Sequence, residues 1–166
     1  MSDTAPAPYL LPPVLISRAD LARLAREVEG LENELEAQRV RESADTASSH
    51  MPAMSRNLND FLETNKLDIA DDQTRMALKE RLRVMKDQAP IIHMTFAADA
   101  DPDSLRQLVT WLRTEVHPQA LISVGLQPSI VGGVYMRTPN HVHDFTLRSL
   151  LAGKHEAILH ELEGLA

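Results

Sequence analysis

The sequence contains no cysteine, few aromatic residues and no long uninterrupted hydrophobic run, and each absence excludes something. Without cysteine there is no disulfide, no thiolate metal ligand and no cysteine nucleophile. The longest apolar stretch, residues 9–16, is interrupted by Pro12 and Pro13 and is much shorter than the ~20 residues of a membrane-spanning helix. No basic residue precedes it, so it does not have the charged start of a signal peptide. We therefore expect a soluble, cytoplasmic protein without a membrane span.

Positive charge is also scarce. The 166-residue chain has 17 Lys and Arg against 24 Asp and Glu, a formal net charge of −7. Nucleic-acid binding depends on clustered Lys and Arg that displace counterions from phosphates, so we expect no nucleic-acid partner for this acidic chain. Hydrophobic residues make up 43% of the chain and charged residues 25%, which is typical of a globular protein with a buried core.

The N-terminal half is predicted to be helical. Residues 1–16, with their prolines and small polar residues, predict a flexible tail. In the helix expected over 17–42, apolar residues recur at alternating spacings of three and four. This seam consists of Leu21, Leu24, Val28, Leu31 and Leu35. It fits either an amphipathic helix packed on its own domain or a short coiled coil, so it is a candidate partner-docking surface. A linker over 43–55 and a helical pair over 56–89 are expected to follow.

Residues 90–166 predict a β-α-β-β-α unit. Alternating apolar residues over 91–97 and an apolar run over 120–126 predict strands, with an amphipathic helix between them. This order implies a parallel strand pair joined by a right-handed crossover. The remaining elements are two strands and a final helix, over 130–137, 141–146 and 146–165. The expected fold class is α+β, with N-terminal helices followed by this C-terminal unit and its small mixed sheet.

The sequence shows no catalytic constellation. His141 and His143 fall on one face of a predicted strand with Asp144 beside them, but a metal site needs three or four converging ligands. We therefore expect no catalytic residue, no cofactor and no bound metal, with a hydrolase or metal enzyme at these residues as the alternative. The pair Gly132 and Gly133 inside a strand favours a bulge or the close packing of a neighbouring helix, with an anion-binding nest as the alternative.

An ordered motif runs through the last third of the chain. It comprises a proline, a Gly-Gly pair between apolar residues, a basic residue, a short turn, an aspartate, and a Thr-x-Arg-x-x-Leu helix start. Its members are Pro128, Gly132, Gly133, Arg137, Asp144, Thr146, Arg148 and Leu151. This order resembles the C-terminal region of the delta subunit of F-type ATP synthases, the family that includes the mitochondrial oligomycin-sensitivity-conferring protein. The resemblance covers about residues 91–165.

The resemblance implies a function without catalysis. Delta subunits belong to the peripheral stalk, the stator that links the catalytic head to the b-subunit stalk during proton-driven ATP synthesis. The resemblance implies that the protein forms a hetero-oligomer with b subunits and with alpha subunits of the head. It also implies a location in the cytoplasm, at the inner membrane through the complex. Family members carry an N-terminal six-helix bundle, whereas about three helices precede Ile91, so the head would meet a reduced surface. The alternative is a free-standing helical adaptor or regulatory protein that uses the same module.

Overall fold

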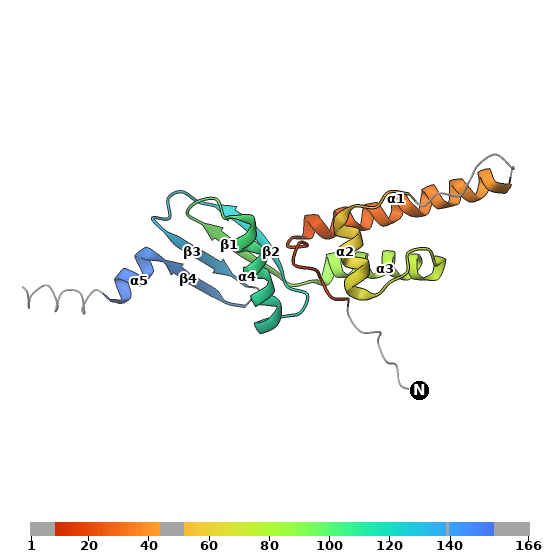
Figure 1. The fold of residues 1–166 in the computed structure, drawn as a ribbon. Coiled ribbons are helices and arrows are strands. Elements are labelled where there is room, and N and C mark those ends of the chain that lie inside the picture. The colour runs from red at the N-terminus through yellow and green to blue at the C-terminus, as the bar shows by residue number, and fades with distance from the viewer. Residues whose placement is uncertain (1–8, 44–51, 139, 155–166) are drawn as a thin grey trace, which may run out of the picture.

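The structure is a computed structural model that describes residues 9–43, 52–138 and 140–154, and it contains a helical unit followed by a small α/β unit (Figure 1). The helical unit comprises α1 (Arg18–Ser43), α2 (Arg56–Asn65) and α3 (Asp72–Gln88). The α/β unit comprises β1 (Ile91–Phe96), α4 (Pro102–Glu115), β2 (Leu121–Leu126), β3 (Gly133–Arg137), β4 (Val142–Thr146) and α5 (Leu147–Gly153). The predicted α+β class is confirmed. Within the described ranges, no helix combines the length and the apolar character needed to cross a membrane.

Short polar side chains determine where several helices begin. Ser55, Asp71 and Asp101 precede α2, α3 and α4, and each accepts a hydrogen bond from the backbone N–H three residues further on. Helix α4 also has Pro102 in its first turn, where the missing N–H has no consequence. Helix α2 ends at Asn65, and the left-handed φ of 52° at Lys66 turns the chain out of the helix.

The seam of α1 is buried inside its own unit. Leu21, Leu24, Val28 and Leu31 are at most 4% exposed, while Leu35 is partly buried. The four share one core with α2 and α3, whose contributions are Leu58, Phe61, Leu62, Leu78, Leu82 and Met85. The expectation of a partner-docking seam is therefore wrong for these four positions. Helices α2 and α3 supply enough apolar surface to cover them within the chain.

Residues 9–16 are packed between the two units. Leu11 and Leu15 are 7% and 1% exposed and lie in the helical core, and Ile16 packs against the core of the sheet. The expectation of a flexible tail is therefore wrong for this part, because the free energy gained by burying Leu11, Leu15 and Ile16 exceeds the conformational entropy that the segment loses. The rest of the expected tail, residues 1–8, lies outside the described residues.

Within the described part of the chain, the sheet has four strands in the order β2-β1-β3-β4. Strands β1 and β2 are parallel, while β3 is antiparallel to both β1 and β4, so the sheet is mixed as predicted. Strand β3 begins at Gly133 rather than at residue 130. Helix α5 is described as far as Gly153, and the rest of the helix expected over 146–165 lies outside the described residues, as do residues 44–51 of the expected linker.

The two faces of the sheet differ in character. Helix α4 packs on one face, where Ile92, Met94 and Ile122 form a second core with Val109 and Leu112 of the helix (Figure 1). Side chains of alternate residues point to the opposite face. On that face lie the exposed side chains of His93, Tyr135, Arg137 and Asp144.

Candidate functional site

Arg113, in the last turn of α4, ties the N-terminal segment to the α/β unit. Its guanidinium donates hydrogen bonds to the carbonyl oxygens of Leu11 at 2.9 Å and Pro12 at 3.0 Å, and also to that of Leu15. Its Nε donates to the carbonyl oxygen of Ala120 at 3.1 Å. Burial lowers the pKa of Arg113 to about 10, so the group stays charged at neutral pH. A cation is thus held by four backbone carbonyl groups.

Backbone and apolar contacts reinforce this junction. The N–H of Ile122 donates to the carbonyl oxygen of Ile16 at 2.8 Å, so the N-terminal segment adds one link to the outer edge of β2. Leu121 is fully buried in the helical core, although it belongs to the sheet. Sequence reasoning missed the junction. Two features of the sequence could have indicated it: the apolar run around Pro12 and Pro13, and Arg113 beside the apolar stripe of a helix.

The glycine pair of the motif lies where β3 meets β4. Gly133 has a φ of +92°, and a Cβ atom there would overlap the Phe145 carbonyl oxygen and come within 2.9 Å of the Thr146 Cα. At Gly132 the nearest atom to an added Cβ is the Leu147 Cβ at 3.8 Å, an ordinary contact. The predicted close approach is therefore present at Gly133, but the neighbour is a strand and not a helix.

Asp144 and Thr146 form the joint between β4 and α5. Thr146 caps α5, since its hydroxyl oxygen accepts from the N–H of Ser149 at 3.3 Å. The Asp144 Oδ1 accepts from the N–H of Thr146 at 2.9 Å. Hydrogen bonds from the side chain and then the backbone of Thr146 lower the pKa of Asp144 below its usual value. These two motif positions therefore determine where the strand ends and the helix begins.

The other motif residues are exposed. They are Pro128 in the turn after β2, Arg137 at the end of β3, and Arg148 and Leu151 on α5. Around α5 the exposed side chains are mostly apolar. We call this the α5 surface, and it consists of Phe145, Leu147, Leu150 and Leu151, each between 45% and 54% exposed.

The histidine pair lies apart from the neighbouring carboxylate. The rings of His141 and His143 are 6.2 Å apart, and His143 stacks on Phe145 at 5.8 Å. Asp144 follows His143 directly in β4, so its side chain points to the opposite face. Among the residues that the structure describes, no group of three or more potential ligands could hold a metal ion. That the protein works without metal stays a prediction.

Comparison with known proteins supplies no function for this chain. No family model matches the sequence, and no curated protein matches it. The information on function is thus structural and comes from three features. They are the Arg113 junction, the joint between β3, β4 and α5 at Gly133, Asp144 and Thr146, and the α5 surface.

Proposed function

We propose that this protein is a non-catalytic peripheral-stalk subunit of an F-type ATP synthase, which links the catalytic head to the b-subunit stalk. The observation that carries the proposal is the ordered motif from Pro128 to Leu151. Three positions of the motif have structural roles in this fold. Gly133 permits the close approach of β3 to β4, and Asp144 and Thr146 accept backbone hydrogen bonds at the start of α5.

The α5 surface is the proposed contact with the b subunits. Its four apolar side chains are about half exposed, and fully burying such a side chain stabilises a complex by ~1.5–3 kcal/mol. In Figure 1, α5 lies at the end of the molecule away from the helical unit. A stalk helix bound there would leave the helical unit accessible to a second partner.

The helical unit is the proposed contact with the alpha subunits of the head. Because the α1 seam is buried, this contact would use the outer surface of the unit, where Met76 and Val84 of α3 are exposed. A stator holds the head against the torque of the rotor, so the two contact surfaces must not hinge against each other. The Arg113 junction and residues 9–16 supply that rigidity, because hydrogen bonds from a charged group contribute ~1.5–3 kcal/mol each.

The proposal is tested in the cells from which the protein comes, by isolating the ATP synthase through a tag on a head subunit. We expect the protein to be recovered at constant stoichiometry with the b subunits. Replacing both Leu150 and Leu151 by aspartate should remove the b subunits from this assembly and leave the fold intact. Trp111→Asp, an equally exposed apolar position on α4, is the matched control and should have no such effect. Absence of the wild-type protein from the complex would overturn the proposal in favour of a free-standing adaptor.

A further inference from the structure

The polar face of the sheet contains an open groove that the stalk proposal does not use. The groove has a volume of about 620 Å³. The side chains that line it come from β1, β3 and the turns that follow β2 and β3. They are Ile91, His93, Thr95, Gln127, Tyr135, Arg137 and Thr138.

Strand register determines how these side chains are arranged. His93 of β1 lies opposite Arg137 of β3, and Thr95 lies opposite Tyr135. Gln127 is held at the end of the groove, because its N–H donates to the Phe96 carbonyl oxygen at 2.9 Å. The groove therefore has a basic end at His93 and Arg137 and an aromatic, hydroxyl-bearing end at Tyr135 and Thr95.

The charge of the groove differs from that of the whole chain. The protein has 24 Asp and Glu residues, yet none is among the described residues that line this groove. Within the described ranges, Arg137 has no ion-pair partner. A guanidinium presents a planar set of donors that matches phosphate oxygens in a bidentate manner, and an imidazole beside it adds another donor. The basic end is thus suited to a phosphate group.

The aromatic end lies at a suitable distance for a planar ring. Tyr135 is 38% exposed and stands two residues from Arg137 on the same face, roughly 7 Å along the strand. Nucleobases stack on aromatic side chains in this manner with little dependence on which base is present. A ribose spans a comparable distance between a base and its 5′-phosphate.

A second hollow adjoins the groove on the far side of Tyr135. It has a volume of about 470 Å³ and shares Tyr135 and Gln127 with the groove, but it also contains Asp144 and Arg148. Asp144 stands next to Tyr135, on the side away from β1, and Arg148 lines the same hollow, so side chains of opposite charge meet there. The His93–Arg137 end has basic side chains without a carboxylate among its described lining residues, which makes it the better site for an anion. The net charge of −7 also repels a long polyanion, so the ligand that fits is small.

We propose that this groove binds a mononucleotide, with its phosphate groups on Arg137 and His93 and its base stacked on Tyr135. The proposal does not depend on the stalk function. It concerns the face of the sheet opposite to α4, and its test uses the isolated chain without any ATP synthase subunit.

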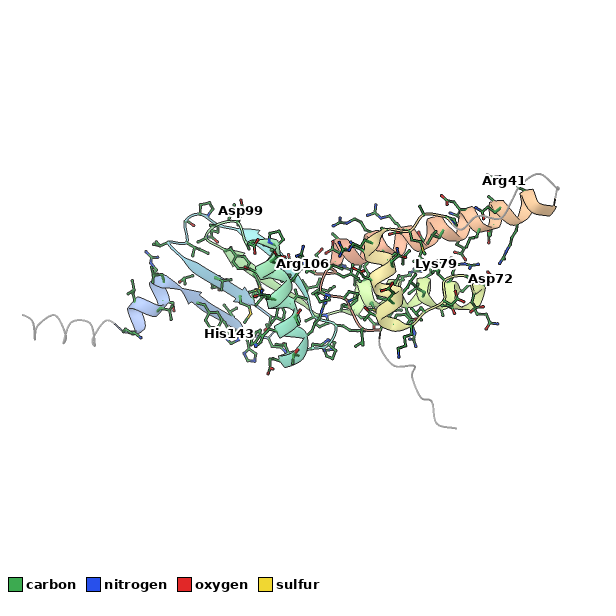
Figure 2. All side chains as sticks on the ribbon, in the orientation of Figure 1. Arg41, Asp72, Lys79, Asp99, Arg106 and His143 are labelled. Atoms are coloured by element: carbon green, nitrogen blue, oxygen red, sulfur yellow. The ribbon has the colours of Figure 1, made fainter. Side chains whose placement is uncertain are left out.

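The test is equilibrium binding of ADP to the full chain by isothermal titration calorimetry, with pyrophosphate and adenosine as separate ligands. We expect ADP to bind more tightly than either. Arg137→Gln should weaken ADP binding at least tenfold. Tyr135→Leu should weaken ADP binding several-fold and leave pyrophosphate binding unchanged. The matched control is Arg106→Gln, because Arg106 is an exposed arginine on α4, which packs on the opposite face (Figure 2).

Several outcomes would overturn the proposal. One is an absence of ADP binding to the wild-type protein at millimolar concentration, and another is equal ADP binding by the wild-type and Arg137→Gln proteins. If pyrophosphate bound as tightly as ADP and Tyr135→Leu had no effect, the site would bind simple anions and not nucleotides. If adenosine matched ADP, the phosphate subsite would be refuted. Both substituted side chains are exposed, so circular dichroism should show that the variants remain folded.

Discussion

The guanidinium of Arg113 donates a hydrogen bond to the carbonyl oxygen of Leu11, 102 positions earlier in the chain, at a distance of 2.9 Å. This contact makes the N-terminal segment part of the α/β unit as well as of the helical unit. Leu15 repeats the arrangement, since its side chain lies in the helical core and its carbonyl oxygen accepts from Arg113. The boundary near residue 90 therefore separates the units in sequence, but residues 9–16 join them.

Arg113→Ala should destabilise the protein strongly. The substitution leaves four partly buried carbonyl oxygens without their donor, and we expect the free energy of unfolding to fall by ~2–4 kcal/mol. Chemical denaturation measures this change. Arg106→Ala is the control, because its exposed ion pair with Asp103 contributes ~0–1 kcal/mol. Equal denaturation midpoints for the two variants would contradict the assigned role of Arg113.

Removal of residues 1–16 should destabilise both units more than removal of residues 1–8 alone. The longer truncation removes the buried side chains of Leu11 and Leu15, each worth ~1.5–3 kcal/mol, and uncovers Leu121. Thermal unfolding of the two truncated chains measures the difference. If the chain beginning at residue 17 melted at the temperature of the full chain, the packing of residues 9–16 would not contribute to stability.

Gly133→Val should disrupt the pairing of β3 with β4. The new side chain would overlap the backbone of β4 at Phe145 and would occupy a φ of +92°, so we expect a loss of ~2–4 kcal/mol from overpacking and backbone strain. Gly132→Ala is the matched control, because an added Cβ there meets only an ordinary contact at 3.8 Å. Urea denaturation of the two variants should separate them. Similar midpoints would show that the close approach is not required.

Aspartate at Leu24 and Leu31 should unfold the helical unit. Both side chains are at most 4% exposed, and an unpaired buried charge together with the lost apolar contacts should cost more than ~4 kcal/mol. Leu35→Asp is a milder control, since Leu35 is partly buried. Far-UV circular dichroism measures the loss of helix. If the Leu24→Asp/Leu31→Asp variant stayed folded but no longer assembled with partners, the result would contradict this expectation and support the intermolecular coiled coil.

Asp144 should make the joint between β4 and α5 sensitive to acid. The hydrogen bonds from the side chain and the backbone of Thr146 lower the pKa of Asp144 below its usual value in the folded protein. The ionised Asp144 carboxylate therefore stabilises the folded protein fully at a pH above its unfolded-state pKa. This stabilisation is lost as the pH falls through the lower folded-state pKa. Between about pH 5 and pH 2 the stability of Asp144→Asn should fall less steeply than that of the wild type. An NMR titration of the Asp144 carboxyl group would contradict this if its midpoint equalled that of an unfolded chain.

Much of the fold was accessible from local sequence. The start of helix α4 depends on Asp101 and Pro102, and a cap and a proline in the first turn act only on neighbours along the chain. The parallel pairing of β1 with β2 followed from their connection by a helix. A close approach at the Gly132-Gly133 pair was also expected, but the neighbour is strand β4 and not the helix that was predicted.

Local sequence specifies which stretches become helices and strands and which of their faces are apolar, since hydrogen-bonded turns, caps and periodicity act over a few residues. What covers those faces depends on long-range packing. The α1 seam suited a partner helix as well as α2 and α3, because burial depends on area and not on which chain supplies it. Residues 9–16 are a second example, because their local sequence predicts a flexible tail. In the structure they contact Arg113 and both cores, and the free energy of these long-range contacts exceeds the conformational entropy that the segment loses.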